Sequence, residues 1–174
     1  MSYLIVGLIS AAYFHFLYES VLAPSFRLKL RFELFALRDE LRRLKIERAD
    51  CLDDTHFDFL QESLNGLIRI LDRFSVATLI AVENGIRRNP CLEEQLEVRA
   101  RILDDCEIPN VLSIRDRSLR IAARAVAVNN GAWAIYLGPA TLPFLGLSKL
   151  KKLIKASLSL PGAQLEEAST SSLA

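Results

Sequence analysis

The sequence predicts an all-α membrane protein with an N-terminal transmembrane helix, a small cytosolic helical bundle and a second membrane segment toward the C-terminus. The chain opens on an apolar run, residues 3–23, in which Glu19 is the one certain charge. Hydrophobic residues make up 51% of the 174 residues and charged residues still make up 25%, so the two kinds are segregated along the chain. In the middle of the chain, leucines recur at steps of three and four, the spacing of one helix face.

Residues 3–23 are the first expected span, because about 20 apolar residues cross a hydrocarbon core of about 30 Å as a helix. No Lys or Arg precedes Arg27, so the run lacks the basic start of a cleavable signal peptide, and we expect it to stay as an anchor. Pro24 marks the expected exit from the membrane. Basic residues follow at Arg27, Lys29, Arg31 and Arg38, which predicts an external N-terminus and a cytoplasmic bundle.

Residues 25–120 are the predicted cytosolic helical region. Apolar and polar residues alternate over 26–35 as in a strand, but the leucines that follow favour a helix to about residue 49. A second helix opens near Thr55 with a capping-box-like start. Ser75 then caps a short helix over 76–88, and Pro90 begins another. We find neither an internal repeat nor strands joined by hairpin turns in the sequence.

Residues 121–147 are the predicted second membrane segment, and within it 125–147 pass without a charge. Asn129, Asn130 and the Gly138–Pro139 pair weaken a simple straight helix. Because basic residues flank both ends, two solutions stay open, a full crossing or a re-entrant turn. Residues 148–160 have the pattern of a basic amphipathic helix lying on anionic lipid, and 161–174 have the composition of a disordered tail.

One face of the first span carries small and polar residues that are candidates for helix contact or pore lining. Small residues let helices approach closely, and polar side chains in lipid need partners. Glu19 also lies close enough to the end of the span to reach the headgroups instead. The candidate residues, with the two asparagines of the second segment, are Gly7, Ala11, His15, Glu19, Asn129 and Asn130.

Arginines in the stretch after the span are candidate contacts to an acidic partner or nucleic acid: Arg38, Arg42 and Arg43. The alternative is a solvated helix surface with ion pairs such as Asp39 with Arg43. The formal net charge of +1 argues against a protein that binds nucleic acid through its overall charge.

The sequence offers little support for catalysis. The three cysteines form no CxxC pair, and the sequence has no phosphate-binding glycine loop, HExxH or GxSxG motif. His56 follows Cys51 by five residues, but both fall at an expected loop and helix start. We therefore expect no enzyme, no cofactor, no metal site and no small-molecule substrate.

The order of these parts, together with the stretch RFELFALRDELRRL at 31–44, resembles the two-span membrane effectors of bacterial retron anti-phage systems. The resemblance implies a protein of the bacterial inner membrane that a reverse transcriptase and its RNA–DNA product hold inactive and that damages the membrane once released. The leading hypothesis is thus a self-associating membrane effector or toxin. The alternatives are a membrane-anchored adaptor whose helical region binds a cytosolic partner, and a subunit of a larger membrane complex.

Overall fold

A computed structural model describes residues 2–47, 52–104, 108–131 and 147–160. In these residues the chain is helical and contains no strand, which confirms the predicted all-α class. The elements are α1 (Ser2–Leu17), the π-helical turn η1 (Tyr18–Leu22), α2 (Ala23–Glu47), α3 (Asp54–Ile70), the 3-10 turn η2 (Leu71–Arg73), α4 (Val76–Arg88), α5 (Pro90–Asp104), α6 (Pro109–Asn129) and α8 (Leu147–Ser159).

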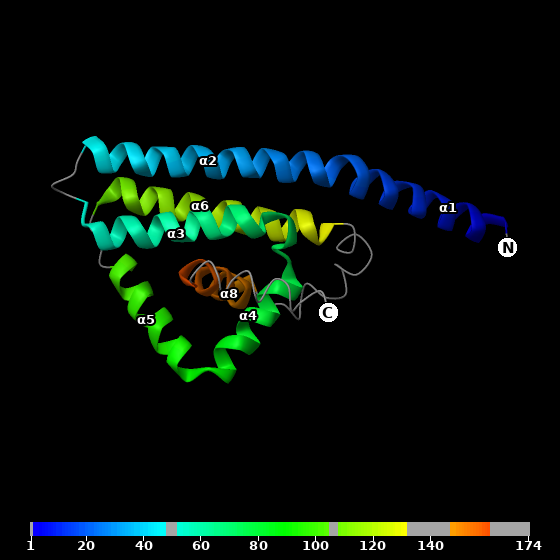
Figure 1. Cartoon of the computed structure of the whole chain (residues 1–174). Helices are drawn as coiled ribbons and strands as arrows, with labels where there is room; N and C mark the ends of the chain where they lie inside the picture. The colour runs from blue at the N-terminus through cyan, green and yellow to red at the C-terminus, as the bar shows by residue number, and fades with distance from the viewer. Residues whose placement is uncertain (1, 48–51, 105–107, 132–146, 161–174) are drawn as a thin grey trace.

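The first three elements form one continuous rod, which projects well beyond the bundle at its N-terminal end (Figure 1). Proline lacks an N–H and its ring presses on the carbonyl one turn earlier, so Pro24 disturbs a regular helix at this point. The π turn lies immediately before Pro24, and its wider winding lets the Ala23 N–H reach the Tyr18 carbonyl. The helix therefore continues through Pro24 instead of ending there.

The bundle is built on the antiparallel pairing of α2 with α6 (Figure 1). Buried residues recur at steps of three and four on both helices, so their apolar stripes face each other. Glu33 pairs with Arg124 at 2.6 Å and Glu40 pairs with Arg117 at 2.7 Å. Because seven residues forward on α2 match seven residues backward on α6, the two ion pairs agree with a single antiparallel register.

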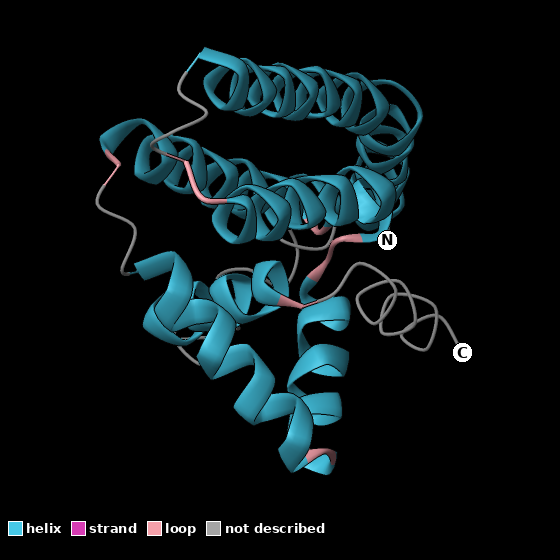
Figure 2. Ribbon diagram, turned by 60° about the vertical axis from the view of Figure 1, so that its left-hand side comes forward, coloured by secondary structure: helices cyan, strands magenta, loops and turns pink. Residues whose placement is uncertain are grey.

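Of the remaining helices, α3 packs beside α2 and α6, while α4 and α5 form the two arms of a V with α8 between them (Figure 1). Figure 2 shows from another side that the described elements are helices joined by short loops. Ile154, Leu158 and Leu160 of this C-terminal segment are buried, and α8 contacts α3, α4, α5 and α6. The expectation that residues 148–160 lie on lipid is therefore corrected, because protein covers the apolar side of α8. Its periodicity predicts that one side is buried but does not say what buries it.

Several predicted helix boundaries are confirmed. The Ser75 side chain caps α4 by accepting a hydrogen bond from the Thr78 N–H, and α5 begins at Pro90. The second helix begins slightly earlier than predicted, because the Asp53 carboxylate caps α3 by accepting a hydrogen bond from the Thr55 N–H. The α2 helix ends at Glu47, and the rest of its predicted extent lies outside the described residues.

The predicted second membrane segment, 121–147, is corrected at its start. Residues 121–129 are the last turns of α6, and Ile121, Ala122, Ala125 and Val126 are buried within the bundle. In this part of the segment the apolar side chains pack against protein, and Arg124 pairs with Glu33. Residues 132–146, like the tail 161–174, lie outside the described residues, and a second membrane segment is not shown.

Candidate functional site

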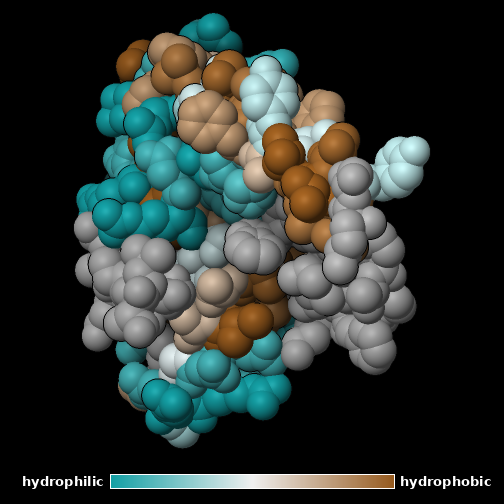
Figure 3. All heavy atoms as spheres, turned by 90° about the vertical axis from the view of Figure 1, so that its right-hand side faces the viewer, coloured by the Kyte–Doolittle hydropathy of each residue, from teal (hydrophilic) through white to brown (hydrophobic). Residues whose placement is uncertain are grey.

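The helix Tyr3–Glu47 is long and apolar enough to cross a membrane, and it is the one such helix in the described residues. No part of its most apolar window is buried within the protein. Figure 3 looks at the molecule from the projecting end and shows hydrophobic side chains gathered there. The large apolar side chains of this segment that are exposed by about half or more are Tyr3, Leu4, Ile5, Val6, Leu8, Ile9, Tyr13, Phe14, Phe16, Val21 and Leu22.

The predicted helix-contact face lies along α1 and η1. Gly7 has open space where a side chain would project, since no atom lies within 4 Å of the position that a Cβ would take there. Ala11, His15 and Glu19 are half-buried, one turn apart from each other in sequence. The face thus has no projecting side chain at Gly7, near the N-terminus, and has polar side chains at His15 and Glu19, near the bundle. Its role in helix contact stays a prediction.

A chain of polar contacts joins the inner end of the apolar helix to the bundle, and we call it the junction. Its carboxylate is Glu19, which lies 3.7 Å from the Arg27 guanidinium. The Arg27 Nε donates to the Asn129 Oδ1 at 2.7 Å. The Asn129 Nδ2 in turn donates to the Leu71 carbonyl at 2.8 Å and to the Phe74 carbonyl at 3.0 Å. The junction therefore links η1, α2, α6 and the turn around η2.

The π turn helps to bring Glu19 and Arg27 together. Eight residues along a regular α-helix place two side chains about 80° apart around the axis. A π turn winds less per residue, so it reduces that offset and turns both side chains to the bundle side. Sequence reasoning missed Arg27 as a site residue, because a spacing of eight residues on a regular helix does not indicate contact with Glu19.

Tyr18 makes a second contact between the apolar helix and the bundle. Its hydroxyl donates to the Val128 carbonyl at 2.8 Å, which satisfies a carbonyl of the last α6 turn. The same hydroxyl lies where a Cβ on Gly131 would project, so this close approach requires glycine. No sequence signal points to Tyr18, because the contact joins residues 110 positions apart.

The two asparagines predicted as pore lining have different surroundings. Asn129 is the centre of the junction, with both ends of its amide hydrogen-bonded. The Asn130 Nδ2 donates to the Val126 carbonyl of its own helix at 2.6 Å. The structure therefore brings Glu19 and Asn129 together through Arg27 within one chain, and it places Asn130 beside them at the end of α6.

The three arginines predicted as partner contacts each have a different neighbour. Arg38 lies over the Phe35 ring, with its guanidinium carbon 5.0 Å from the ring centroid. The Arg42 Nε donates to the Gln61 side chain at 3.3 Å. The Arg43 side chain is 68% exposed, with Glu47 3.8 Å away. Their role in partner binding stays a prediction.

Among the described residues, no three His, Cys, Asp or Glu side chains are grouped so that they could hold a metal ion. The His56 Nε2 lies 2.9 Å from the Ile102 carbonyl, so this histidine joins the start of α3 to α5. Cys51, its sequence neighbour, lies outside the described residues. Comparison with protein-family models, curated proteins and solved structures finds no match. Function must therefore be inferred from the apolar helix and the junction.

Proposed function

We propose that this chain is a membrane-anchored helical binding protein, held in the bilayer by residues 3–22 and presenting its bundle to a cytosolic partner. The observation that carries this proposal is a contrast within one helix. In α2, Leu34, Leu37 and Leu41 are buried against other helices, whereas no residue of the apolar window before it is buried. A bilayer supplies the apolar surroundings that the protein does not supply.

Length and charge support this placement. Twenty residues at 1.5 Å each extend over about 30 Å, which matches the hydrocarbon thickness of a bilayer. Arg27, Lys29 and Arg31 follow directly, and basic residues next to a span favour the cytoplasmic side. The bundle is then cytoplasmic and the N-terminus lies outside.

The junction supports a fixed arrangement of the bundle against the anchor. Arg27 lies close enough to Glu19 to balance its charge near the edge of the hydrocarbon, where an unpaired carboxylate is costly. Tyr18 adds a contact from the same turn to the end of α6. A loose tether needs neither contact, so we infer that the bundle is held at a defined angle to the membrane.

A second candidate is the self-associating membrane effector or toxin that the retron resemblance implies. The observation that favours it is the face of α1 on which Gly7 leaves open space and His15 adds a polar group to an apolar helix. Small residues permit close helix contact in lipid, and polar side chains within a membrane segment mark candidate sites of helix contact. In this role, a reverse transcriptase with its RNA–DNA product restrains the effector, and exposed Arg43 is the open phosphate contact.

Expression of the chain alone in bacteria tests both candidates. The anchor predicts that the full chain stays in the membrane pellet after alkaline carbonate extraction and that a chain lacking residues 3–23 does not. Recovery of the full chain in the supernatant contradicts the anchor. A voltage-sensitive dye separates the candidates: rapid depolarisation that requires residues 3–23 favours the effector, and an unchanged potential with abundant membrane-bound protein favours the binding protein.

A further inference from the structure

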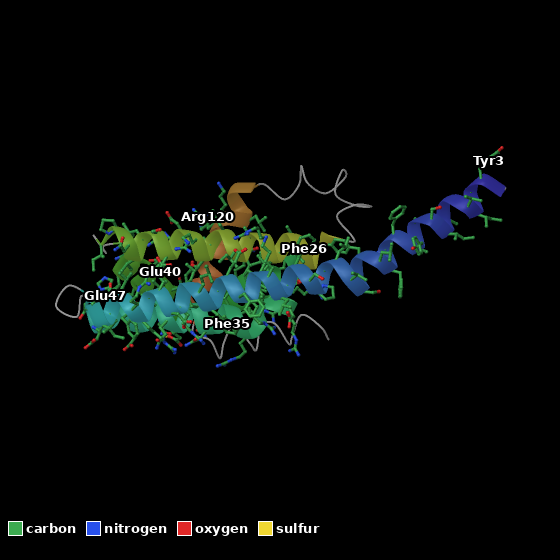
Figure 4. The ribbon with its side chains drawn as sticks, turned by 90° about the horizontal axis from the view of Figure 1, so that it is seen from above. Tyr3, Phe26, Phe35, Glu40, Glu47 and Arg120 are labelled. Atoms are coloured by element: carbon green, nitrogen blue, oxygen red, sulfur yellow. The ribbon has the colours of Figure 1, made fainter. Side chains whose placement is uncertain are left out.

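The side of α2 that faces away from the bundle carries an apolar strip that no described helix covers. We call it the outer face and define it by Ser25, Leu28, Phe32 and Ala36, which border a shallow hollow with Lys29 and Glu33. Leu28 is 54% exposed and Phe32 is 61% exposed. Figure 4 views α2 from this side, and no other described helix lies over it. The outer face continues directly from the apolar helix, because Tyr3–Glu47 is a single rod.

Lipid cannot cover this strip along its whole length. If residues 3–22 fill the hydrocarbon core, Phe32 lies about 15 Å beyond it at 1.5 Å per residue. The headgroup layer on each side of a bilayer is only about 5–8 Å thick. Phe32 therefore lies in water unless protein covers it, and a large exposed aromatic side chain next to Leu28 favours such a contact.

Membrane insertion decides which faces of two neighbouring copies can meet. Two copies inserted with the basic residues on the cytoplasmic side have the same orientation, so their rods run parallel. In a symmetric pair, each residue then faces the same residue of the second copy across a two-fold axis. The steps from Ser25 to Leu28 and from Leu28 to Phe32 are three and four residues, the spacing of a coiled-coil seam. Phe32 then packs against Phe32 of the second copy.

The charged side chains that flank the seam allow this pairing over residues 25–36, and those beyond this stretch oppose it. In a parallel pair, each residue flanking the seam faces the residue five positions further on in the other helix. The same heptad continues to Phe35, so Ala36 lies at the edge of the seam. Arg31 then faces Ala36, and no like charges meet over the outer face. Beyond it, Asp39 enters the seam and Arg38 faces Arg43, so like charges separate the two helices.

We propose that the outer face of α2 is the contact surface between two parallel copies of this chain in the membrane. The proposal rests on the proposed membrane anchor. Three helical turns bury much less than the roughly 800 Å² per partner of a stable interface in water, so confinement of both copies to the bilayer is required. The bundles of the pair diverge past Asp39, which leaves their outer ends apart.

Cysteine cross-linking in membranes tests the contact directly. The variant Phe32→Cys is made in the full chain with Cys51, Cys91 and Cys106 replaced by serine, and isolated membranes are oxidised with copper phenanthroline. The Cα atoms of facing seam residues lie within the roughly 4.4–6.8 Å that a disulfide spans, so we expect a disulfide-linked dimer as the main species on a non-reducing gel. Ile46→Cys is the matched control, because Ile46 is 82% exposed on the same helix and lies past the charged residues. We expect it to stay monomeric.

Each other outcome overturns the proposal. A membrane-bound Phe32→Cys chain that stays monomeric refutes the contact and leaves the anchor intact. Equal cross-linking at Phe32 and Ile46 indicates random collision between copies. A cross-link from Phe32→Cys to a protein of another mass assigns the outer face to a different partner. Loss of the chain from the membrane fraction contradicts the anchor itself and, with it, this contact.

Discussion

Replacing Asn129 by alanine tests whether the junction holds the bundle together. The substitution removes three hydrogen bonds at once, one from Arg27 and one each to the carbonyls of Leu71 and Phe74. Asn130 is a natural control, because it has the same side chain one residue later and bonds only within α6. Both asparagines were predicted from the sequence as pore lining, so the comparison also bears on that hypothesis.

The expected loss follows from the partners. Each hydrogen bond to a backbone carbonyl contributes about 1 kcal/mol net. The bond from Arg27 involves a charged donor, but the Arg27 side chain is 24% exposed and keeps Glu19 nearby, so water replaces much of it and its loss costs about 1 kcal/mol. We therefore expect Asn129→Ala to lower the free energy of unfolding by about 3 kcal/mol, and Asn130→Ala by less than about 1 kcal/mol.

Thermal unfolding in detergent, followed by circular dichroism at 222 nm, measures the difference. For a domain of this size, about 1 kcal/mol shifts the Tm by about 2–4 °C, so Asn129→Ala should lower the Tm by about 10 °C. The shift for Asn130→Ala should be about 2 °C. Equal shifts for the two variants would refute the reasoning, because the junction would then contribute no more than a local bond at a helix end.

Three further predictions concern the anchor, the Tyr18 contact and the start of α3. Ala12→Arg places a charge at the middle of the span at a cost of about 2.5–3.5 kcal/mol, so carbonate extraction should release more of this variant than of Ala12→Leu. Gly131→Ala should displace the Tyr18 hydroxyl and lower the Tm of the bundle, while Tyr18→Phe alone should cost about 1 kcal/mol; an unchanged Tm for Gly131→Ala would contradict the close approach. Hydrogen bonding from Thr55 lowers the pKa of the Asp53 carboxyl. The ionised carboxylate therefore stabilises the fold fully above its ordinary pKa of about 3.9, and this stabilisation is lost as the pH falls through the lowered pKa. Acid unfolding of Asp53→Asn should therefore depend less steeply on pH, and an identical profile would contradict the cap.

Much of the helical architecture followed from local patterns. The Ser75 cap, the proline start at Pro90 and the leucine steps of α2 each depend on residues within one or two turns, and the structure contains all three. The apolar helix was predictable for the same reason, since hydrophobic length is a property of consecutive residues. The sequence indicated that Glu19 needs a partner or the headgroups, and it did not indicate Arg27, which lies 3.7 Å from that carboxylate.

The predictions that differed from the structure concern whether lipid or protein covers an apolar helix face. Residues 121–129 and α8 have patterns that suit either lipid or protein, and the bundle buries the apolar side of each. Hydrophobic periodicity measures only the removal of side chains from water, and a bilayer and a protein core satisfy it equally.

The sequence alone determined most of the helices, the Ser75 cap and the length of the apolar segment, because each depends on neighbouring residues. The tertiary structure decided which residues meet: Tyr18 with Val128 and Arg27 with Asn129 are joined across more than a hundred positions. Such contacts depend on the register between helices and on the π turn before Pro24, and no local spacing encodes either. The junction could therefore be found only once the helices were packed.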